Sequence, residues 1–179
     1  MHTRRPQTTI VLDIDSSVSE TRGAQEGSAY NWHFGCTCYH PLFVFNQFGD
    51  LERCALRPGN VHRAADWRDV LERVVARYRH GMKRWYFRGD AAAANPAIYE
   101  FLEAEGYKYT IRLPANAVLQ ERIGWLLKLP AGRPPHGVRR YYSSFSYRAA
   151  SWDKALPVIA RSNGTPASCI RASGSLSPT

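Results

Sequence analysis

Three aspartates stand where predicted β-strands end. Asp13 and Asp15 close the β-branched run TTIVLDID (residues 8–15), and Asp90 closes the run RWYFRGD (residues 84–90). Side chains alternate between the faces of a strand, so Asp13 and Asp15 share one face at its carboxyl end. Open α/β sheets build their sites at this edge, and carboxylates there suit Mg²⁺ or Mn²⁺, two of which can assist phosphodiester displacement. The alternative is structural, because Asp commonly starts turns and caps helices.

Several arginines lie near these acids or among aromatic residues. Arg88 precedes Asp90 by two positions and shares its strand face, so it can reach a phosphate or simply lie exposed. Others are interleaved with the aromatic residues of 141–147, a pattern that allows backbone contacts and base stacking but is equally typical of a strand core. The predicted DNA-contacting residues are Arg88, Arg57, Arg139, Arg140 and Arg148.

The composition favours a polyanionic partner. The 179 residues include 24 Lys and Arg against 15 Asp and Glu, a formal net charge of +9, which makes nucleic acid the leading partner class. A merely basic protein is the alternative, because charge governs association and not fold. No stretch approaches the roughly 18 apolar residues of a membrane span, and no apolar segment follows the basic start. The sequence therefore predicts a cytoplasmic, nucleoid-associated protein without a membrane partner.

Other kinds of site find little support in the sequence. The four cysteines lack the paired spacing of a zinc site and the density of a disulfide scaffold, so we predict reduced thiols. The alternative is a metal cluster of Cys36 and Cys38 with His33 and His40. No glycine pattern of a phosphate-binding loop follows a predicted strand, and Ser16 lies in no nucleophile elbow. A nucleotide-binding enzyme and a serine hydrolase are therefore disfavoured.

The elements that must position these residues alternate between strands and helices. Apolar periodicity, capping residues and turn residues define them. In chain order they are a strand at 8–15, a Gly-rich loop at 16–31, a β-hairpin turning at 48–50, a helix at 64–79, a strand at 84–90, a helix at 95–106, a strand at 107–113, a helix at 115–129 and β-prone residues at 138–152. This order predicts an α/β or α+β three-layer sheet, without by itself choosing one fold.

Four segments closely resemble the group-1 DDE transposases of bacterial insertion sequences. They are TTIVLDIDSSVSETRGAQEGSAYN, GCTCYHPLFVFNQFGDLERCALRPGNVH, RWYFRGDAAAANPAIYEFLEAEGYKYTIRLPAN and RRYYSSFSYRAASW, and the similarity runs from about Pro6 to Ala160. The resemblance implies a ribonuclease-H-like mixed sheet with flanking helices, followed by a β-rich insertion. It also implies an Asp-Asp-Glu triad that binds two divalent ions, Mg²⁺ or Mn²⁺, and performs cleavage and strand transfer at transposon ends.

The resemblance assigns catalytic roles to the aspartates. The first acid of the family directly precedes a small hydroxyl residue, a context that Asp15 before Ser16 matches best, with Asp13 in reserve. Asp90 in YFRGD resembles the second acid. The third is a Glu on a helix after the insertion, and nothing here matches it, because the Glu residues of 100–105 come too early. Asp15 and Asp90 are therefore the implied metal ligands.

The resemblance also divides the chain into parts. These are a disordered start at 1–7, a partial catalytic domain at 8–130, the start of a β-rich insertion at 131–160 and a disordered tail at 161–179. The family's continuation, translated one nucleotide out of phase, can give the tail, so we predict a frameshift near codon 160. We then expect a fold incomplete at its C-terminus and an inactive transposase fragment. The alternatives are a non-catalytic fragment that binds DNA or interferes with full-length transposase as an oligomer partner, and a pseudogene product.

Overall fold

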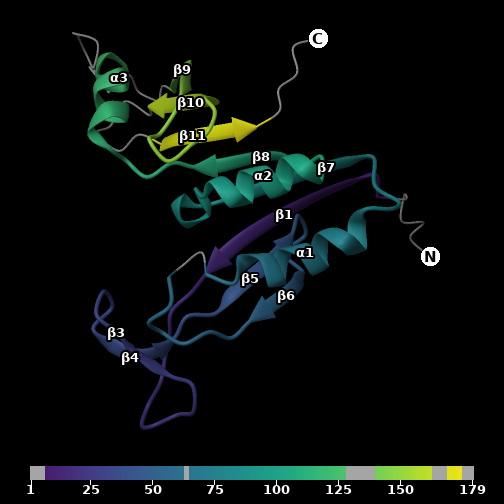
Figure 1. The fold of residues 1–179 in the computed structure, drawn as a ribbon, viewed down its shortest axis with the longest axis vertical. Helices are drawn as coiled ribbons and strands as arrows, with labels where there is room; N and C mark the ends of the chain where they lie inside the picture. Colours follow the sequence, from purple (N-terminus) through teal and green to yellow (C-terminus); the bar gives the residue numbers. More distant parts are fainter. Residues whose placement is uncertain (1–6, 63–64, 128–139, 163–168, 175–179) are drawn as a thin grey trace.

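Eight strands of the described chain form one mixed sheet. The computed structural model describes residues 7–62, 65–127, 140–162 and, for the backbone, 169–174. The strand order across the sheet is β6-β5-β1-β7-β8-β11-β10-β9 (Figure 1). The strands are β1 (Thr9–Ser16), β5 (Leu42–Asn46), β6 (Leu51–Ala55), β7 (Arg84–Gly89), β8 (Lys108–Arg112), β9 (Tyr141–Tyr147), β10 (Leu156–Ser162) and β11 (Cys169–Gly174).

The strand β1 lies inside the sheet, and its pairing sets the geometry of the acids. It runs antiparallel to β5 and parallel to β7, and β7 runs parallel to β8. Its alternate residues Ile10, Leu12 and Ile14 are buried, as the period of two predicts. The carboxyl ends of β1, β7 and β8 therefore meet at one edge of the sheet. The predicted α/β or α+β architecture, with a hairpin before helix-separated strands, is confirmed.

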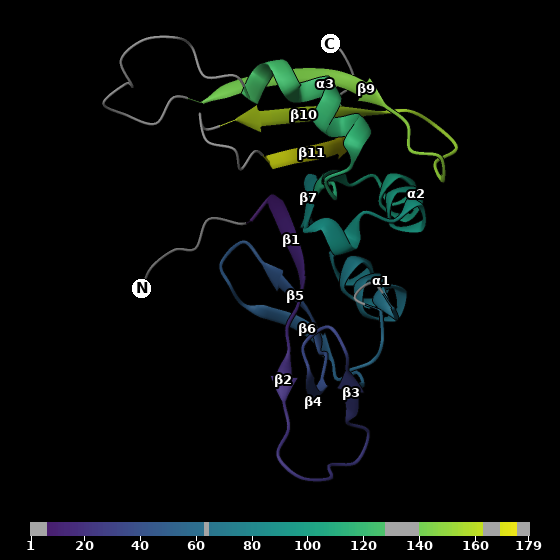
Figure 2. The same ribbon diagram turned by 90° about the vertical axis from the view of Figure 1, so that its left-hand side faces the viewer.

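Two helices cover the apolar face of these strands. The helix α1 (Trp67–Tyr78) lies between β6 and β7 along the chain, and α2 (Pro96–Ala104) lies between β7 and β8. Figures 1 and 2 show both helices on the same side of β1, where they share one core with the buried strand residues. The opposite strand face is only half-buried at Val11, Phe45 and Tyr86. None of the described helices has the length and hydropathy that a bilayer crossing requires.

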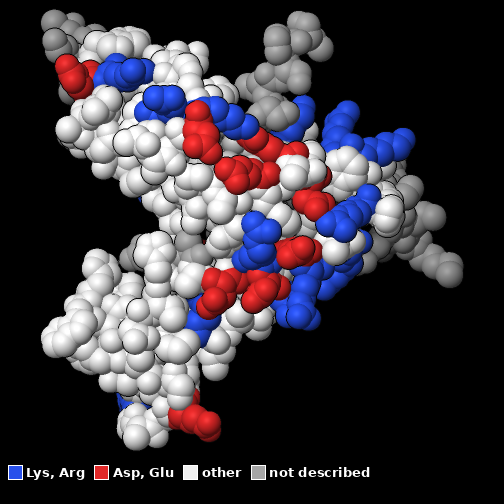
Figure 3. Space-filling view, in the orientation of Figure 1, with Lys and Arg blue, Asp and Glu red and all other residues white. Residues whose placement is uncertain are grey.

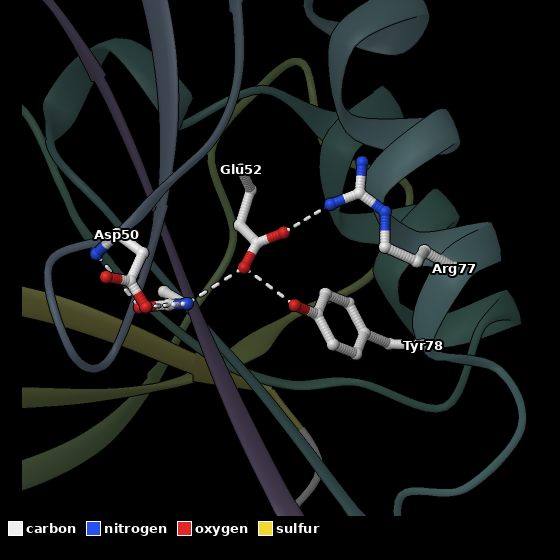
Figure 4. A network of polar contacts seen from close by, with 5 residues as sticks. Asp50, Glu52, Arg77 and Tyr78 are labelled. Atoms are coloured by element: carbon white, nitrogen blue, oxygen red, sulfur yellow. Dashed lines mark hydrogen bonds and ion pairs between the residues drawn. The ribbon is translucent and has the colours of Figure 1, made fainter.

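A buried carboxylate joins the hairpin β5–β6 to α1 (Figure 4). Glu52 on β6 accepts hydrogen bonds from Asn46 Nδ2 at 2.8 Å, Tyr78 OH at 2.6 Å and Arg77 Nη1 at 2.6 Å. Its side chain is 6% exposed. Burial, and then the bond to Glu52, raises the pKa of Tyr78 to about 12. These contacts fix the helix against the edge of the sheet, because a buried carboxylate needs its partners to stay in place.

A second, small sheet follows β1 in a segment predicted as a loop. It consists of β2 (Ser19–Glu20), β3 (Ala29–Asn31) and β4 (Cys36–Tyr39) in the order β2-β4-β3. The predicted loop at 16–31 is therefore corrected. Short polar strands pair through backbone groups and carry no apolar period. Their packing is close, since a Cβ at Gly59 would lie 2.5 Å from the Ala29 carbonyl oxygen.

The cysteines of β4 lie side by side in this small sheet. Cys38 is fully buried and Cys36 half-buried, and neither forms a disulfide. Burial raises the pKa of the Cys38 thiol. Within the described ranges, no three His, Cys, Asp or Glu side chains form a group able to hold a metal. The alternative of a metal cluster with His33 and His40 therefore gains no support.

The C-terminal strands extend the central sheet. The helix α3 (Ala117–Leu127) contacts β9 and β10. β9 lies within the segment 138–152 that was predicted to be β-prone, and β10 follows that segment. The tail at 161–179 was expected to be disordered, but β10 continues to Ser162 and Cys169–Gly174 forms β11, which pairs with β8 and β10. Pairing on both sides satisfies the backbone groups of a strand in which Ile170 is the one large apolar residue. The rest of the tail and residues 1–6 lie outside the described residues.

Candidate active site at the carboxyl ends of parallel strands

Parallel pairing brings Asp15 and Asp90 together. In the register between β1 and β7, Asp13 pairs with Arg88 and Ile14 with Gly89. Asp15 and Asp90 each follow one residue later. Asp15 and Asp90 both line two hollows of the surface, a larger one with a volume of about 720 Å³ and a smaller one with a volume of about 10 Å³. The predicted convergence of acids from two strands at the carboxyl edge is therefore present.

Each of these carboxylates is oriented by its own backbone. Asp15 Oδ1 accepts a hydrogen bond from Ser16 N at 2.8 Å, and Asp90 Oδ1 accepts one from Ala92 N at 2.9 Å. The second contact caps the 3₁₀ turn η1 (Ala91–Ala93), so the structural use of Asp90 is real. Both side chains remain exposed. Because the cap uses one carboxylate oxygen, the other oxygen stays available, so Asp90 can both cap the turn and bind a ligand.

Asp13 is in a different situation, because it forms an ion pair with Arg88. Arg88 Nε donates to Asp13 Oδ1 at 2.6 Å, and Arg88 Nη2 donates to Asp13 Oδ2. The paired side chains are 57% and 31% exposed for Arg88 and Asp13. The bonds to Asp13 raise the pKa of Arg88 above its ordinary value. A two-point contact of this kind occupies both oxygens of the carboxylate.

The larger hollow lies on the half-buried face of the sheet, away from α1 and α2. Its walls come from β1, β7, β8 and the turn of the hairpin. The acids and Arg88 share it with residues that sequence reasoning did not single out, namely Phe45, Asn46, Gln47, Gly49, Thr110 and Arg112. Of these, Arg112 had a usable signal, because it stands at the end of a predicted strand on the face opposite a buried Ile111.

The face covered by helices carries mixed charge. Figure 3 shows Lys and Arg side chains interleaved with Asp and Glu over α1 and α2, while the visible face of the lobe of β3 and β4 carries few charged side chains. Ion pairs account for part of this pattern, including Arg79 with Glu105 at 2.5 Å and Lys154 with Glu103. The bond to Arg79 lowers the pKa of Glu105. Positive charge on this face is therefore partly compensated by neighbouring carboxylates.

The predicted DNA-contacting arginines do not form one surface. Arg57 is only 3% exposed, and its Nε donates to the His40 carbonyl oxygen at 2.9 Å while Nη1 donates to that of Ala65. Burial lowers the pKa of Arg57. The prediction of a DNA contact is therefore corrected for Arg57, whose donors bind backbone in the interior. Arg139 lies outside the described residues.

Arg140 and Arg148 flank β9 at the edge of the sheet. Both are exposed, but β8, β11 and β10 separate β9 from the strand that leads to Asp90. A role in contacting DNA stays a prediction for these two residues. Of the predicted arginines that the structure describes, Arg88 alone lines the hollow with the acids.

The donor set at the acids fits a hard divalent cation. Two exposed carboxylates, each with one oxygen not engaged by the backbone bond described above, supply the oxygen ligands that Mg²⁺ and Mn²⁺ prefer. Mg²⁺ commonly binds through one or two carboxylates and keeps several waters. In the described residues, no third acid joins Asp15 and Asp90 in a metal-binding group. The residues present therefore fit a weakly held ion.

Comparison with solved structures defines the fold class. The chain is similar to the cryo-EM structure of a piggyBac transposase synaptic complex with hairpin DNA, with a TM-score of 0.55 and 13% sequence identity. The similarity covers 97% of this chain and 34% of that chain, so this chain spans about a third of that transposase. The ribonuclease-H-like mixed sheet with flanking helices is confirmed by this likeness.

Comparison with family models identifies the family. Residues 1–169 match the model of the transposase DDE domain, group 1. The chain belongs to this family, as the resemblance implied. No sequence among the curated proteins matches the chain.

Proposed function

We propose that this chain carries part of the catalytic centre of a metal-dependent DNA transposase, with Asp15 and Asp90 as its metal ligands. The observation that carries the proposal is the convergence of these two acids at the ends of adjacent parallel strands. Family membership supports the same reading. The substrate we propose is DNA, at the ends of an insertion sequence.

Asp15 and Asp90 concentrate negative charge at the edge of the sheet. Their backbone bonds to Ser16 and Ala92 hold the carboxylates in place before any cation arrives, so little rotational freedom is lost on binding. A divalent ion bound there would supply Lewis acidity toward a phosphodiester and an activated water or 3′-hydroxyl. The carboxylates of Asp15 and Asp90 would hold that ion, and the strands β1 and β7 set the separation of the two carboxylates.

Asp13 and Arg88 have a positioning role in this proposal. Their ion pair lies one row behind the acids on the same strand face. It keeps Asp13 from acting as a ligand and places a cationic group in the lining of the hollow. Asp15, rather than Asp13, is therefore the better candidate for the first catalytic acid.

We further propose that the chain by itself is inactive in strand transfer. A transposase of this family needs a third acid, and within the described residues none joins Asp15 and Asp90 besides the paired Asp13. Residual nicking in Mn²⁺ is compatible with a two-carboxylate site. The frameshift near codon 160 stays a prediction, which the coding DNA refutes if no alternative frame restores the family sequence.

A second candidate function is DNA binding without catalysis. The formal charge of +9 favours it, because phosphate neutralisation supplies most non-specific affinity. Such a fragment could occupy transposon ends or associate with full-length transposase. Binding that weakens with salt, without nicking, would favour this function over the catalytic one.

The test is nicking of supercoiled plasmid DNA in Mn²⁺ by the full chain and by Asp15→Asn and Asp90→Asn variants. Asp69→Asn, an exposed acid on α1, is the matched control. We expect slow nicking by the unaltered chain and by the control, and loss of nicking to background in both site variants. Nicking that persists in Asp15→Asn or Asp90→Asn would refute the assignment. No nicking by any form would leave the DNA-binding function.

A further inference from the structure

Register places a third charged residue in the row of the acids. In the pairing of β7 with β8, Arg88 lies beside Thr110 and Gly89 beside Ile111. The next residues along are Asp90 and Arg112. Since Asp15 follows Ile14 in the same way, Asp15, Asp90 and Arg112 each stand one residue beyond the last paired row of the three parallel strands. All three line the same hollow.

The two arginines of this hollow differ in how their charge is used. Arg88 donates two hydrogen bonds to Asp13, so its charge is compensated locally. Arg112 is exposed, and none of the ion pairs found among the described side chains involves it. Of the two, Arg112 therefore presents the uncompensated guanidinium beside the acids.

The positive charge of Arg112 reduces the repulsion between the two carboxylates and a DNA phosphate. Two adjacent carboxylates repel the phosphodiester that they must approach, and a neighbouring positive charge offsets that repulsion. A guanidinium is suited to the task, because its planar fork can donate two parallel hydrogen bonds to phosphate oxygens. Thr110 lies two residues before Arg112 on the same face of β8 and also lines the hollow, where its hydroxyl can donate a hydrogen bond.

We propose that Arg112 binds the phosphodiester backbone of DNA beside Asp15 and Asp90. The ligand class is a nucleic-acid phosphate, and Thr110 lies within the same subsite. This inference rests on the proposed function, since it takes DNA as the substrate of the acids. It assigns the phosphate contact to Arg112 and not to Arg88, which Asp13 already engages.

The test measures DNA binding without catalysis. Fluorescence anisotropy of a labelled 30-base-pair duplex in EDTA gives Kd for the full chain between 50 and 200 mM NaCl. One lost phosphate contact lowers the slope of log Kd against log salt by about 0.9, so the affinity change across this range shrinks about 3.5-fold. We expect that loss in Arg112→Gln, and the unaltered slope in Arg73→Gln, an exposed arginine on α1.

A further variant makes the result specific. Arg112→Lys keeps the charge, so its slope should match the unaltered chain while its affinity falls, because an ammonium lacks the planar fork. An unaltered slope in Arg112→Gln, or no salt-dependent binding by the chain itself, would overturn the inference. A lower slope in Arg112→Gln, together with no nicking of plasmid DNA by the unaltered chain, would support the phosphate contact of Arg112 and refute the proposed catalysis.

Discussion

The substitution Gly89→Ala should displace the turn that carries Asp90. Gly89 ends β7 directly before the acid, and η1 packs over it. A Cβ at this position would lie 2.6 Å from Ala93 Cβ, 3.3 Å from a ring atom of Phe87 and 3.5 Å from Ile14 Cγ2. The first of these distances falls short of the optimal carbon–carbon separation of about 3.5–4.0 Å by about 0.9 Å or more. Ala93 has no flexible side chain, so its backbone must move.

The magnitude follows from that overlap. Extra methyl groups in a well-packed interior cost about 1–3 kcal/mol. Asp90 accepts from Ala92 N within the same turn, so a shift of η1 moves the carboxylate with it. A metal site needs its ligands within about 0.5 Å of their productive positions. We therefore expect Gly89→Ala to be less stable and to bind Mn²⁺ more weakly.

Urea denaturation would measure the free energy of unfolding, and electron paramagnetic resonance would measure Mn²⁺ affinity. Gly124→Ala is the matched control, because a Cβ there meets nothing within 4 Å. In the helix α3 that change should stabilise the chain by up to about 1 kcal/mol. Wild-type stability together with wild-type Mn²⁺ affinity in Gly89→Ala would refute the reasoning.

Three further predictions concern elements that hold the site. Glu52→Gln should lower the free energy of unfolding in urea by about 1–3 kcal/mol, since Tyr78 and Arg77 lose a charged acceptor; an effect below about 0.5 kcal/mol would contradict the network. Asn95→Ala should cost about 1 kcal/mol by removing the bond to Ala97 N, with equal urea midpoints counting against the cap. The pKa of Tyr78 is raised to about 12, so its stabilisation is present below its ordinary pKa of 10.0 and is lost as pH rises through 12. Tyr78→Phe should therefore flatten the alkaline loss of stability, and an unchanged pH profile would exclude this role.

The acids could be predicted from sequence because local rules decide them. Alternation along 8–15 put Asp13 and Asp15 on one strand face, and the end of the next helix-flanked strand marked Asp90. Local rules could not separate Asp13 from Asp15. That distinction depends on a register between strands 75 residues apart, which pairs Asp13 with Arg88.

Long-range contacts explain the predictions that needed correction. Arg57 looks like any basic residue in the sequence, but the chain folds so that its guanidinium meets carbonyl oxygens of His40 and Ala65. The strands β2, β3, β4 and β11 are short or weakly apolar, and backbone pairing with distant partners forms them. The spacing of apolar residues along the sequence does not predict such pairing.

The most direct test of the account is where a metal binds. Crystals of the chain soaked in MnCl₂ would give an anomalous difference map that locates Mn²⁺. The account predicts a peak in direct contact with the carboxylates of both Asp15 and Asp90, absent in crystals of Asp90→Asn. A peak at Asp13 instead, or none at the carboxyl edge under saturating Mn²⁺, would contradict it.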